Sequence, residues 1–243
     1  MKAQEAIVVV SGGMDSVTLA YHLRAEGYAL HLLGFNYGQR HVRELDSMRS
    51  CARALEASSE VRDLSDVFKA MSTSSLTGSK PVPHGHYAEE SMRDTVVPNR
   101  NAIMFNIAAG IAISRGAQAV GVGVHAGDHF IYPDCRPSFI EALQHEIDEG
   151  NEGFNPPRIL APFLMKTKAQ ICSRGTELGV PWAETWSCYE GGAVHCGRCG
   201  TCVERVLAFR EAGVPDPTIY ADSTYALSVT APTSPALLAS GSS

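Results

Sequence analysis

IVVVSGGMDSVTLAYHLRA, residues 7–25, is the stretch that decides the fold. Its first four residues are apolar and β-branched, which predicts a short buried strand rather than a helix. Ser11, Gly12 and Gly13 break this pattern, and apolar residues then recur at helical spacing, with Asp15 or Ser16 as the expected N-cap. A strand that runs through a glycine-rich turn into a helix directs several backbone N–H groups at one point. We therefore expect an anion-binding site there.

The motif itself narrows the kind of anion. The Walker phosphate loop needs Gly-Lys followed by Ser or Thr, and the dinucleotide fingerprint needs a third glycine three residues on; this chain has neither. The complete motif SGGMDS resembles instead the pyrophosphate loop of the ATP pyrophosphatases, which adenylate a substrate and release pyrophosphate. The resemblance implies ATP chemistry, with Asp15 near Mg²⁺. The alternative is an ordinary tight turn between a strand and a helix.

The composition is that of an acidic globular protein. The chain has 243 residues, of which 44% are hydrophobic and 19% charged, and its net charge is −6. This length suits one domain, or one domain with an appendage. Without a basic stripe, the chain is not expected to bind a long stretch of nucleic acid. It lacks a signal-peptide pattern and any apolar run of about 18 residues, so we expect a cytoplasmic protein without a membrane anchor.

Strand and helix patterns alternate from end to end. Strands are expected at residues 7–10, 28–35, 61–64, 119–124 and 158–163. After the helix that follows the first strand, further helices are expected at residues 42–55, 102–114, 137–149 and 168–178, the last of them capped by Thr167. This alternation predicts a doubly wound, Rossmann-like α/β fold with a mostly parallel sheet. We expect an α/β domain over residues 1–180, a cysteine-rich segment packed on it over 181–220, and a mobile tail over 221–243.

Three polar segments are candidates for ligand binding. The segments at residues 35–41 and 125–137 each follow a predicted strand, where open α/β sheets bind their ligands. The segment at residues 72–100 is a long polar loop, and loops of that length are usually lids, binding loops or disordered segments.

Four cysteines near the C-terminus have the spacing of a metal site. They form the pattern C-x7-C-x2-C-x2-C at Cys188, Cys196, Cys199 and Cys202. Four thiolates with no open position indicate one structural Zn²⁺. An iron–sulfur cluster and redox-active disulfides are the alternatives. The neighbouring His195 is expected to be a bystander. The remaining cysteines, expected to be unpaired, are Cys51, Cys135 and Cys172.

Seven motifs occur together in order along the chain. They are SGGMDS, FNYGQRH at 35–41, STSSLTG at 72–78, VPNRN at 97–101, GVHAGDHFIYPDCRPSF at 123–139, APFLMKTKA at 161–169 and CGRCGTC at 196–202. Over roughly residues 7–220 the set resembles the QueC family of 7-cyano-7-deazaguanine synthases, which make the nitrile precursor of queuosine. The resemblance implies conversion of 7-carboxy-7-deazaguanine with ATP and ammonia. The carboxylate is adenylated, ammonia displaces AMP to give an amide, and a second adenylation allows loss of AMP to the nitrile.

The resemblance also implies roles for individual residues. Asp15, Arg100 and Lys168 are the expected catalytic residues, of which Arg100 and Lys168 counter phosphate or carboxylate charge. ATP and Mg²⁺ are expected at Ser11, Gly12, Gly13, Met14, Asp15 and Ser16, with Asn36, Tyr37, Gly38 and Gln39 near the nucleotide. The deazaguanine pocket is expected at Asp128, Tyr132, Asp134 and Arg136. A homodimer is implied, and no nucleic acid or membrane partner is expected.

The chain departs from the family pattern at three places, and rival functions follow. Many members have glycine where this chain has Asn99, Lys-Ala-Glu where it has Gln170, and Cys-Glu-Thr-Asp where it has His-Ala-Gly-Asp at 125–128. The last departure leaves open an enzyme that stops at the amide or attaches the deazaguanine to another macromolecule. A tRNA thiolase or lysidine-type ligase is a second alternative, and a zinc-bearing nucleotide-binding module without catalysis is a third.

Overall fold

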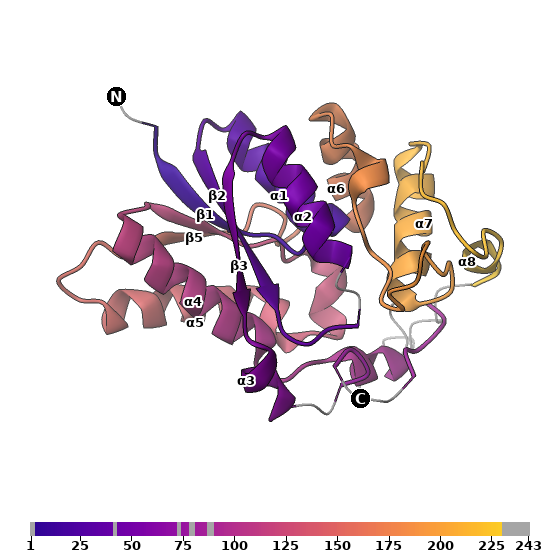
Figure 1. Ribbon diagram of the computed structural model, residues 1–243, viewed down its shortest axis with the longest axis horizontal. Helices are drawn as coiled ribbons and strands as arrows, with labels where there is room; N and C mark the ends of the chain where they lie inside the picture. Colours follow the sequence, from indigo (N-terminus) through magenta and orange to yellow (C-terminus); the bar gives the residue numbers. More distant parts are fainter. Residues whose placement is uncertain (1–2, 41–42, 72–73, 78–80, 87–89, 230–243) are drawn as a thin grey trace, which may run out of the picture.

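The computed structural model describes residues 3–40, 43–71, 74–77, 81–86 and 90–229. Within them, one parallel sheet has the strand order β3-β2-β1-β4-β5. Its strands are β1 (Glu5–Val9), β2 (Ala29–Asn36), β3 (Ser58–Asp63), β4 (Ala119–Gly121) and β5 (Arg158–Leu160). The predicted doubly wound α/β fold is confirmed (Figure 1).

The first predicted strand is the centre of the sheet. Val8 pairs with Leu32 of β2 on one side and with Gly121 of β4 on the other. β1 and β2 are apolar at consecutive positions because both faces of the sheet are covered, as is usual for parallel sheets. β4 and β5 are shorter than the sequence predicts, with three residues each.

Helices cover both faces of the sheet (Figure 1). Ile7 and its neighbours pack under α4 (Arg100–Arg115) and α5 (Pro137–Gly150). Val8, whose side chain points to the other face, belongs to the core formed with α1 (Met14–Ala25), α2 (Arg43–Ala54) and α6 (Lys168–Glu177). Thr167 caps α6 as predicted, in a reciprocal capping box with Gln170. No helix in the part of the chain that the structure describes is long and apolar enough to cross a membrane.

The expected N-cap of α1 is wrong. The helix begins at Met14, and Gly13 occupies the N-cap position without a side-chain hydrogen bond. Ser16 lies inside the first turn, where its Oγ accepts hydrogen bonds from the backbone N–H groups of Ser11 at 3.2 Å and Gly12 at 3.3 Å. Its hydroxyl thus fixes the loop before the helix rather than capping the helix itself.

Beyond the last predicted helix the chain forms two further α-helices, α7 (Gly200–Ala212) and α8 (Tyr225–Ser228). α7 packs beside α6 (Figure 1). Arg205 of α7 is fully buried and donates hydrogen bonds to the Trp182 carbonyl and the Thr185 hydroxyl. This guanidinium ties α7 to the segment that follows α6. Of the predicted tail, residues 221–229 include α8, and residues 230–243 lie outside the described residues.

The remaining helices are short connecting turns. They are α3 (Ser65–Lys69) and the 3-10 helices η1 (Glu90–Thr95), η2 (Ala126–Phe130), η3 (Pro133–Cys135) and η4 (Trp182–Glu184). η1 belongs to the long polar loop predicted at residues 72–100, part of which lies outside the described residues.

Candidate active site

A cavity of about 210 Å³ opens at the carboxyl ends of β1 and β4. This is the edge where open parallel sheets bind ligands. Its lining includes four kinds of group: the glycine-rich loop, the start of α4, the segment after β4, and the start of α6. The residues that the sequence singled out and that line it are Ser11, Gly13, Met14, Asp15, Ser16, Tyr37, Arg100, Asp128, Tyr132 and Lys168.

The glycine-rich loop is held against α2. Gly12 has φ +99°, a left-handed conformation that favours glycine, and a Cβ at this position would collide with the Glu44 carbonyl oxygen. On its other side Gly123, which follows β4, lies so close that its Cβ would be 3.3 Å from the Ser16 Cα. These close approaches leave the loop at the cavity surface with the N-terminus of α1 directed into it, as an anion site requires.

Lys168 is the centre of a buried charge cluster beside that loop. Its Nζ lies 2.7 Å from Asp15 Oδ2 and 2.9 Å from Glu204 Oε2. His125 Nε2 is 3.3 Å from the same Nζ and 3.4 Å from Asp128 Oδ2. The structure thus brings together Asp15 and Lys168, which lie far apart in sequence, and adds two groups from other elements.

The cluster fixes the charges of its members. Burial alone would raise the pKa of Asp15, but Lys168 and His125 outweigh it and hold that pKa below its usual value. Burial works against the charge of Lys168, yet Asp15 and Glu204 raise its pKa. Burial raises the pKa of Glu204, and Lys168 only partly offsets this effect. Asp15 and Lys168 therefore form an ion pair throughout the neutral pH range.

Arg100 lies among tyrosines elsewhere in the cavity wall. Its guanidinium carbon is 5.6 Å from the centre of the Tyr37 ring, in cation–π geometry. Burial opposes its charge, but Tyr37, Tyr189 and Asp134 together raise its pKa. Burial also raises the pKa values of Tyr37 and Tyr189, so both hydroxyls stay neutral beside it. The result is a cation surrounded mainly by neutral hydrogen-bonding groups.

Asn99, which stands where many members of the resembled family have glycine, occupies a backbone position that asparagine tolerates. Asn99 adopts φ +58°, the left-handed conformation in which asparagine is one of the few tolerated residues besides glycine. α4 begins at the next residue, Arg100. Asn99 thus preserves the turn that places Arg100 at the start of α4.

Tyr132 and Cys135 line the same part of the cavity. Tyr132 is buried, and its hydroxyl lies 2.5 Å from the Thr95 Oγ1 of the long polar loop. The Cys135 thiol accepts a hydrogen bond from Asn101 Nδ2 at 3.3 Å, and burial raises its pKa. The cysteine is therefore a neutral thiol in the cavity wall.

Six of the sequence-predicted residues are not among those lining the cavity, and one of them is Gly12, which packs against α2. Asn36 donates to Asp63 Oδ2, and the buried Gln39 donates to the Phe35 carbonyl. Asp134 accepts a hydrogen bond from the backbone N–H of Asn101, within the first turn of α4. Arg136 is exposed and donates to the His129 carbonyl at 2.8 Å. The sixth residue is Gly38, whose N–H donates to Asn36 Oδ1.

Sequence reasoning missed the part of the cavity that the C-terminal segment supplies. Trp186, Ser187, Tyr189 and Thr201 line it, and Glu204 stands directly behind Lys168 in the charge cluster. The available signal was their position: all five residues lie between two residues before Cys188 and two residues after Cys202, a segment that the cysteine spacing marks only as a structural site.

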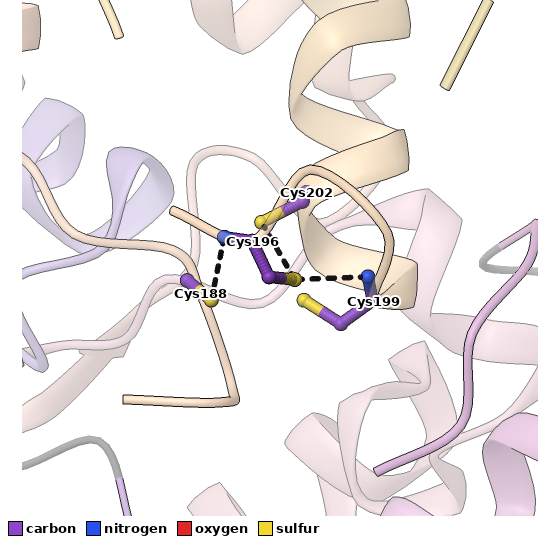
Figure 2. A group of neighbouring side chains, drawn as sticks. All are labelled: Cys188, Cys196, Cys199 and Cys202. Carbon is purple, nitrogen blue, oxygen red and sulfur yellow. Dashed lines mark hydrogen bonds between the residues drawn. The ribbon is translucent and has the colours of Figure 1, made fainter. Parts of the chain in front are cut away.

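The four predicted cysteines do converge (Figure 2). Their Sγ atoms all lie within 4.8 Å of one another, and those of Cys196 and Cys202 are 3.9 Å apart. Tetrahedral Zn–S bonds of about 2.3 Å require sulfur atoms about 3.8 Å apart, so the group fits a metal ion.

The predicted bystander His195 is not part of the sulfur group. Its ring packs 4.3 Å from the Trp186 ring, between centres, and its Nε2 accepts the backbone N–H of Ser187. Burial lowers its pKa to about 4, so this imidazole is neutral.

Comparison with known proteins identifies the family. The family model described as "Queuosine biosynthesis protein QueC" matches residues 5–213. The 7-cyano-7-deazaguanine synthase of Paracoccus denitrificans is 54% identical over 221 residues, which cover 91% of this chain and 95% of that protein. The 7-cyano-7-deazaguanine synthase of Rhizobium meliloti is 52% identical over 226 residues, 93% of this chain and 96% of that protein.

One solved structure that shares the fold class is more distant in sequence. An NH3-dependent NAD synthetase from Campylobacter jejuni aligns over 88% of this chain and 76% of its own, with 11% identity and a TM-score of 0.47. The sequence relatives are therefore the informative comparison, and they confirm the resemblance seen in the seven motifs. The chain belongs to the QueC family, the 7-cyano-7-deazaguanine synthases of queuosine biosynthesis.

Proposed function

We propose that the cavity binds ATP and 7-carboxy-7-deazaguanine together, with the phosphates at the glycine-rich loop and the carboxylate of the substrate toward Arg100. The observation that carries this assignment is the contrast between the two cations of one cavity. Lys168 is in direct contact with two carboxylates beside the loop, whereas Arg100 lies mainly among neutral tyrosines, with Asp134 as its nearby carboxylate. An incoming substrate carboxylate is best matched by the second cation.

The loop side of the cavity suits the phosphates of ATP. The N-terminus of α1 and the N–H groups of the loop stabilise negative charge there. Lys168, kept protonated by its neighbours, supplies a positive charge where charge develops on the phosphate oxygens during adenylation. Each of the two adenylations releases pyrophosphate, and AMP leaves first to ammonia and then on formation of the nitrile.

Asp15 suits a divalent cation. One of its carboxylate oxygens, Oδ2, pairs with Lys168, while Oδ1 is buried and has no hydrogen-bond partner among the described residues. A buried carboxylate oxygen without a partner is costly unless a ligand completes it. Oxygen ligands are those that Mg²⁺ prefers. We propose that Asp15 holds Mg²⁺, which supplies the Lewis acidity for adenylation.

Further assignments complete the proposal. Asp128 recognises the paired N–H donors of the guanine-like edge, since it lies in the cavity wall and a carboxylate only accepts hydrogen bonds. The four-cysteine group holds one structural Zn²⁺. Free ammonia is the nitrogen source, and the working unit is a homodimer in the cytoplasm.

The test is mass spectrometry of the products formed by the purified protein with Mg-ATP, ammonium and 7-carboxy-7-deazaguanine. The expected result is 7-cyano-7-deazaguanine with AMP and pyrophosphate, all absent in Asp15→Ala. Accumulation of the amide alone would move the assignment to an amide-forming enzyme, for which a second AMP would be missing. No AMP under any condition would refute the proposed chemistry.

A further inference from the structure

We propose that Glu204 is a positioning residue for the reaction, which holds Lys168 at the phosphate side of the cavity when Asp15 binds the metal. This inference rests on the proposed function, because it assigns a purpose to a residue of the same charge cluster. It gives α7, and with it the four-cysteine segment, a direct part in arranging the site.

The contact that carries the inference joins three elements. Lys168 is the first residue of α6, Asp15 lies in the first turn of α1, and Glu204 lies in α7. Lys168 Nζ is 2.7 Å from Asp15 and 2.9 Å from Glu204, and each of the three side chains is at most 20% exposed. Asp15 and Lys168 line the cavity but Glu204 does not, so Glu204 acts through Lys168 and not on substrate.

The position of Glu204 depends on the segment after β4. A Cβ at Gly127 would lie 3.2 Å from Glu204 Oε1, a closer approach than side chains usually make. Glu204 Oε2 is buried and lies 2.9 Å from Lys168 Nζ, so the ammonium group can move toward it when Asp15 turns to a cation.

Charge balance explains why Lys168 has Glu204 as a second carboxylate partner. A buried ammonium needs a negative partner, because removing one member of a buried pair is strongly destabilising. If Asp15 were the only partner, Lys168 and the metal would compete for the same carboxylate. Glu204 removes this competition, since it keeps Lys168 neutralised and in place while Asp15 turns to the cation.

The experiment compares three variants in the full-length, zinc-containing protein. Glu204→Gln keeps the shape and removes the charge, and Glu204→Asp keeps the charge. Glu211→Gln is the matched control, because Glu211 is an exposed glutamate of the same helix. For each protein, kcat, the KM values of both substrates and the Mg²⁺ concentration for half-maximal rate are measured. Mg²⁺-dependent ATP binding is measured separately by calorimetry.

Glu204→Gln is expected to lower kcat about tenfold and to raise the Mg²⁺ requirement by a similar factor, the usual range for outer-shell partners of a metal site. The KM for 7-carboxy-7-deazaguanine should not change, and Glu204→Asp should restore part of the rate. In a Lys168→Gln background, Glu204→Gln should cost nothing further, because a residue that acts only through Lys168 is silent without it.

Two results would overturn the inference. One is a Glu204→Gln protein with the kcat and Mg²⁺ dependence of Glu211→Gln. The other is a double variant, Glu204→Gln with Lys168→Gln, whose loss of kcat is the product of the losses of the two single variants. An inactive wild-type protein would count against the proposed function. Binding measured by calorimetry needs no turnover, so the Mg²⁺ dependence of ATP binding would still decide the role of Glu204. Glu204→Asp gives the same decision if Glu204→Gln does not fold.

Discussion

The backbone N–H of Trp186 donates a hydrogen bond of 2.9 Å to the carbonyl oxygen of Gly12. The indole N–H of the same tryptophan donates to the Cys188 carbonyl at 2.9 Å. One residue therefore joins the glycine-rich loop to the first cysteine of the sulfur group. The cysteine segment is part of the construction of the candidate active site, and not only an appendage beside it.

This connection predicts that activity follows metal content. Cys199 is both a member of the sulfur group and the N-cap of α7, so Cys199→Ser should lose the metal and loosen the start of the helix that carries Thr201 and Glu204. Structural zinc sites contribute directly to folding. We expect less than one zinc per chain by elemental analysis, a lower melting temperature and loss of nitrile formation.

Cys172→Ser is the matched control, because Cys172 is buried in α6 outside the sulfur group. It should keep its zinc and most of its activity. A Cys199→Ser protein that is free of zinc yet fully active would contradict the link between the sulfur group and the cavity.

A second prediction separates two costs of replacing a glycine: the conformational cost of a side chain on a left-handed backbone, and the steric cost of a collision with a neighbour. Gly12 and Gly27 both have a left-handed backbone, at φ +99° and +92°. A Cβ at Gly12 would collide with the Glu44 carbonyl, whereas nothing lies within 4 Å of one at Gly27. Gly27→Ala should cost about 1 kcal/mol in the free energy of unfolding, the conformational penalty alone. Gly12→Ala should cost more and also abolish ATP binding.

Urea unfolding and calorimetric titration with ATP provide the two measurements. Equal losses of stability in the two variants would mean that α2 yields to the added methyl group. The close packing of the loop against α2 would then have no part in its function.

Most strands and helices could be predicted from the sequence, because the residues that form each of them are close together along the chain. Ile7 and Val8 of the predicted apolar run are buried on opposite faces of β1, and Thr167 forms a capping box with Gln170 within four residues. α7 was missed for a physical reason as well. Its buried side includes Thr201, Cys202 and a fully buried Arg205, so the apolar periodicity that identifies a helix is absent.

The site could be predicted only in part from sequence. SGGMDS indicated the anion-binding loop from its own glycines, and the cysteine spacing indicated a metal group. Glu204 reaches Lys168, which in turn reaches Asp15, through the packing of three helices that are far apart along the chain. No local pattern encodes such a contact. Arg100 was recognised through its motif, but its tyrosine surroundings come from three different segments.

A third prediction concerns Arg100 and the substrate carboxylate. Arg100→Gln removes the buried cation among the tyrosines, and it keeps a planar hydrogen-bonding group. A charge-assisted hydrogen bond is about twice as strong as a neutral one, so we expect the KM for 7-carboxy-7-deazaguanine to rise by about 10–100-fold. The KM for ATP should change much less, because Lys168 stays in place.

Steady-state kinetics with each substrate varied in turn give the KM for 7-carboxy-7-deazaguanine and the KM for ATP separately. Arg53→Gln, an exposed position in α2, is the control for loss of one positive charge. An Arg100→Gln variant that raises the KM for ATP and leaves that for the carboxylate unchanged would exchange the proposed roles of Arg100 and Lys168.

The last prediction concerns the dependence of stability on pH. The pKa of Asp15 is lowered in the folded protein, because Lys168 and His125 outweigh the effect of burial. Its contribution is therefore fully present above the unfolded pKa of about 3.9 and is lost as the pH falls through the lower folded value. The pKa of Lys168 is raised against burial by Asp15 and Glu204. Its contribution is complete below the unfolded pKa of about 10.4 and is lost as the pH rises through the higher folded value.

The two pKa shifts together predict that the contribution of the Asp15–Lys168 pair to the free energy of unfolding is constant across the neutral pH range. Asp15→Asn should lower the free energy of unfolding by about 2 kcal/mol, the value of a hydrogen-bonded charge, and this difference should stay constant from about pH 5 to pH 9. Below about pH 4 the difference should shrink, because protonation of Asp15 removes the same interaction from the wild-type protein. Urea unfolding across this range without nucleotide measures it. A difference that changes steeply between pH 5 and pH 9 would mean that another group controls the charge of the pair, and the buried His125 beside it would be the first to replace.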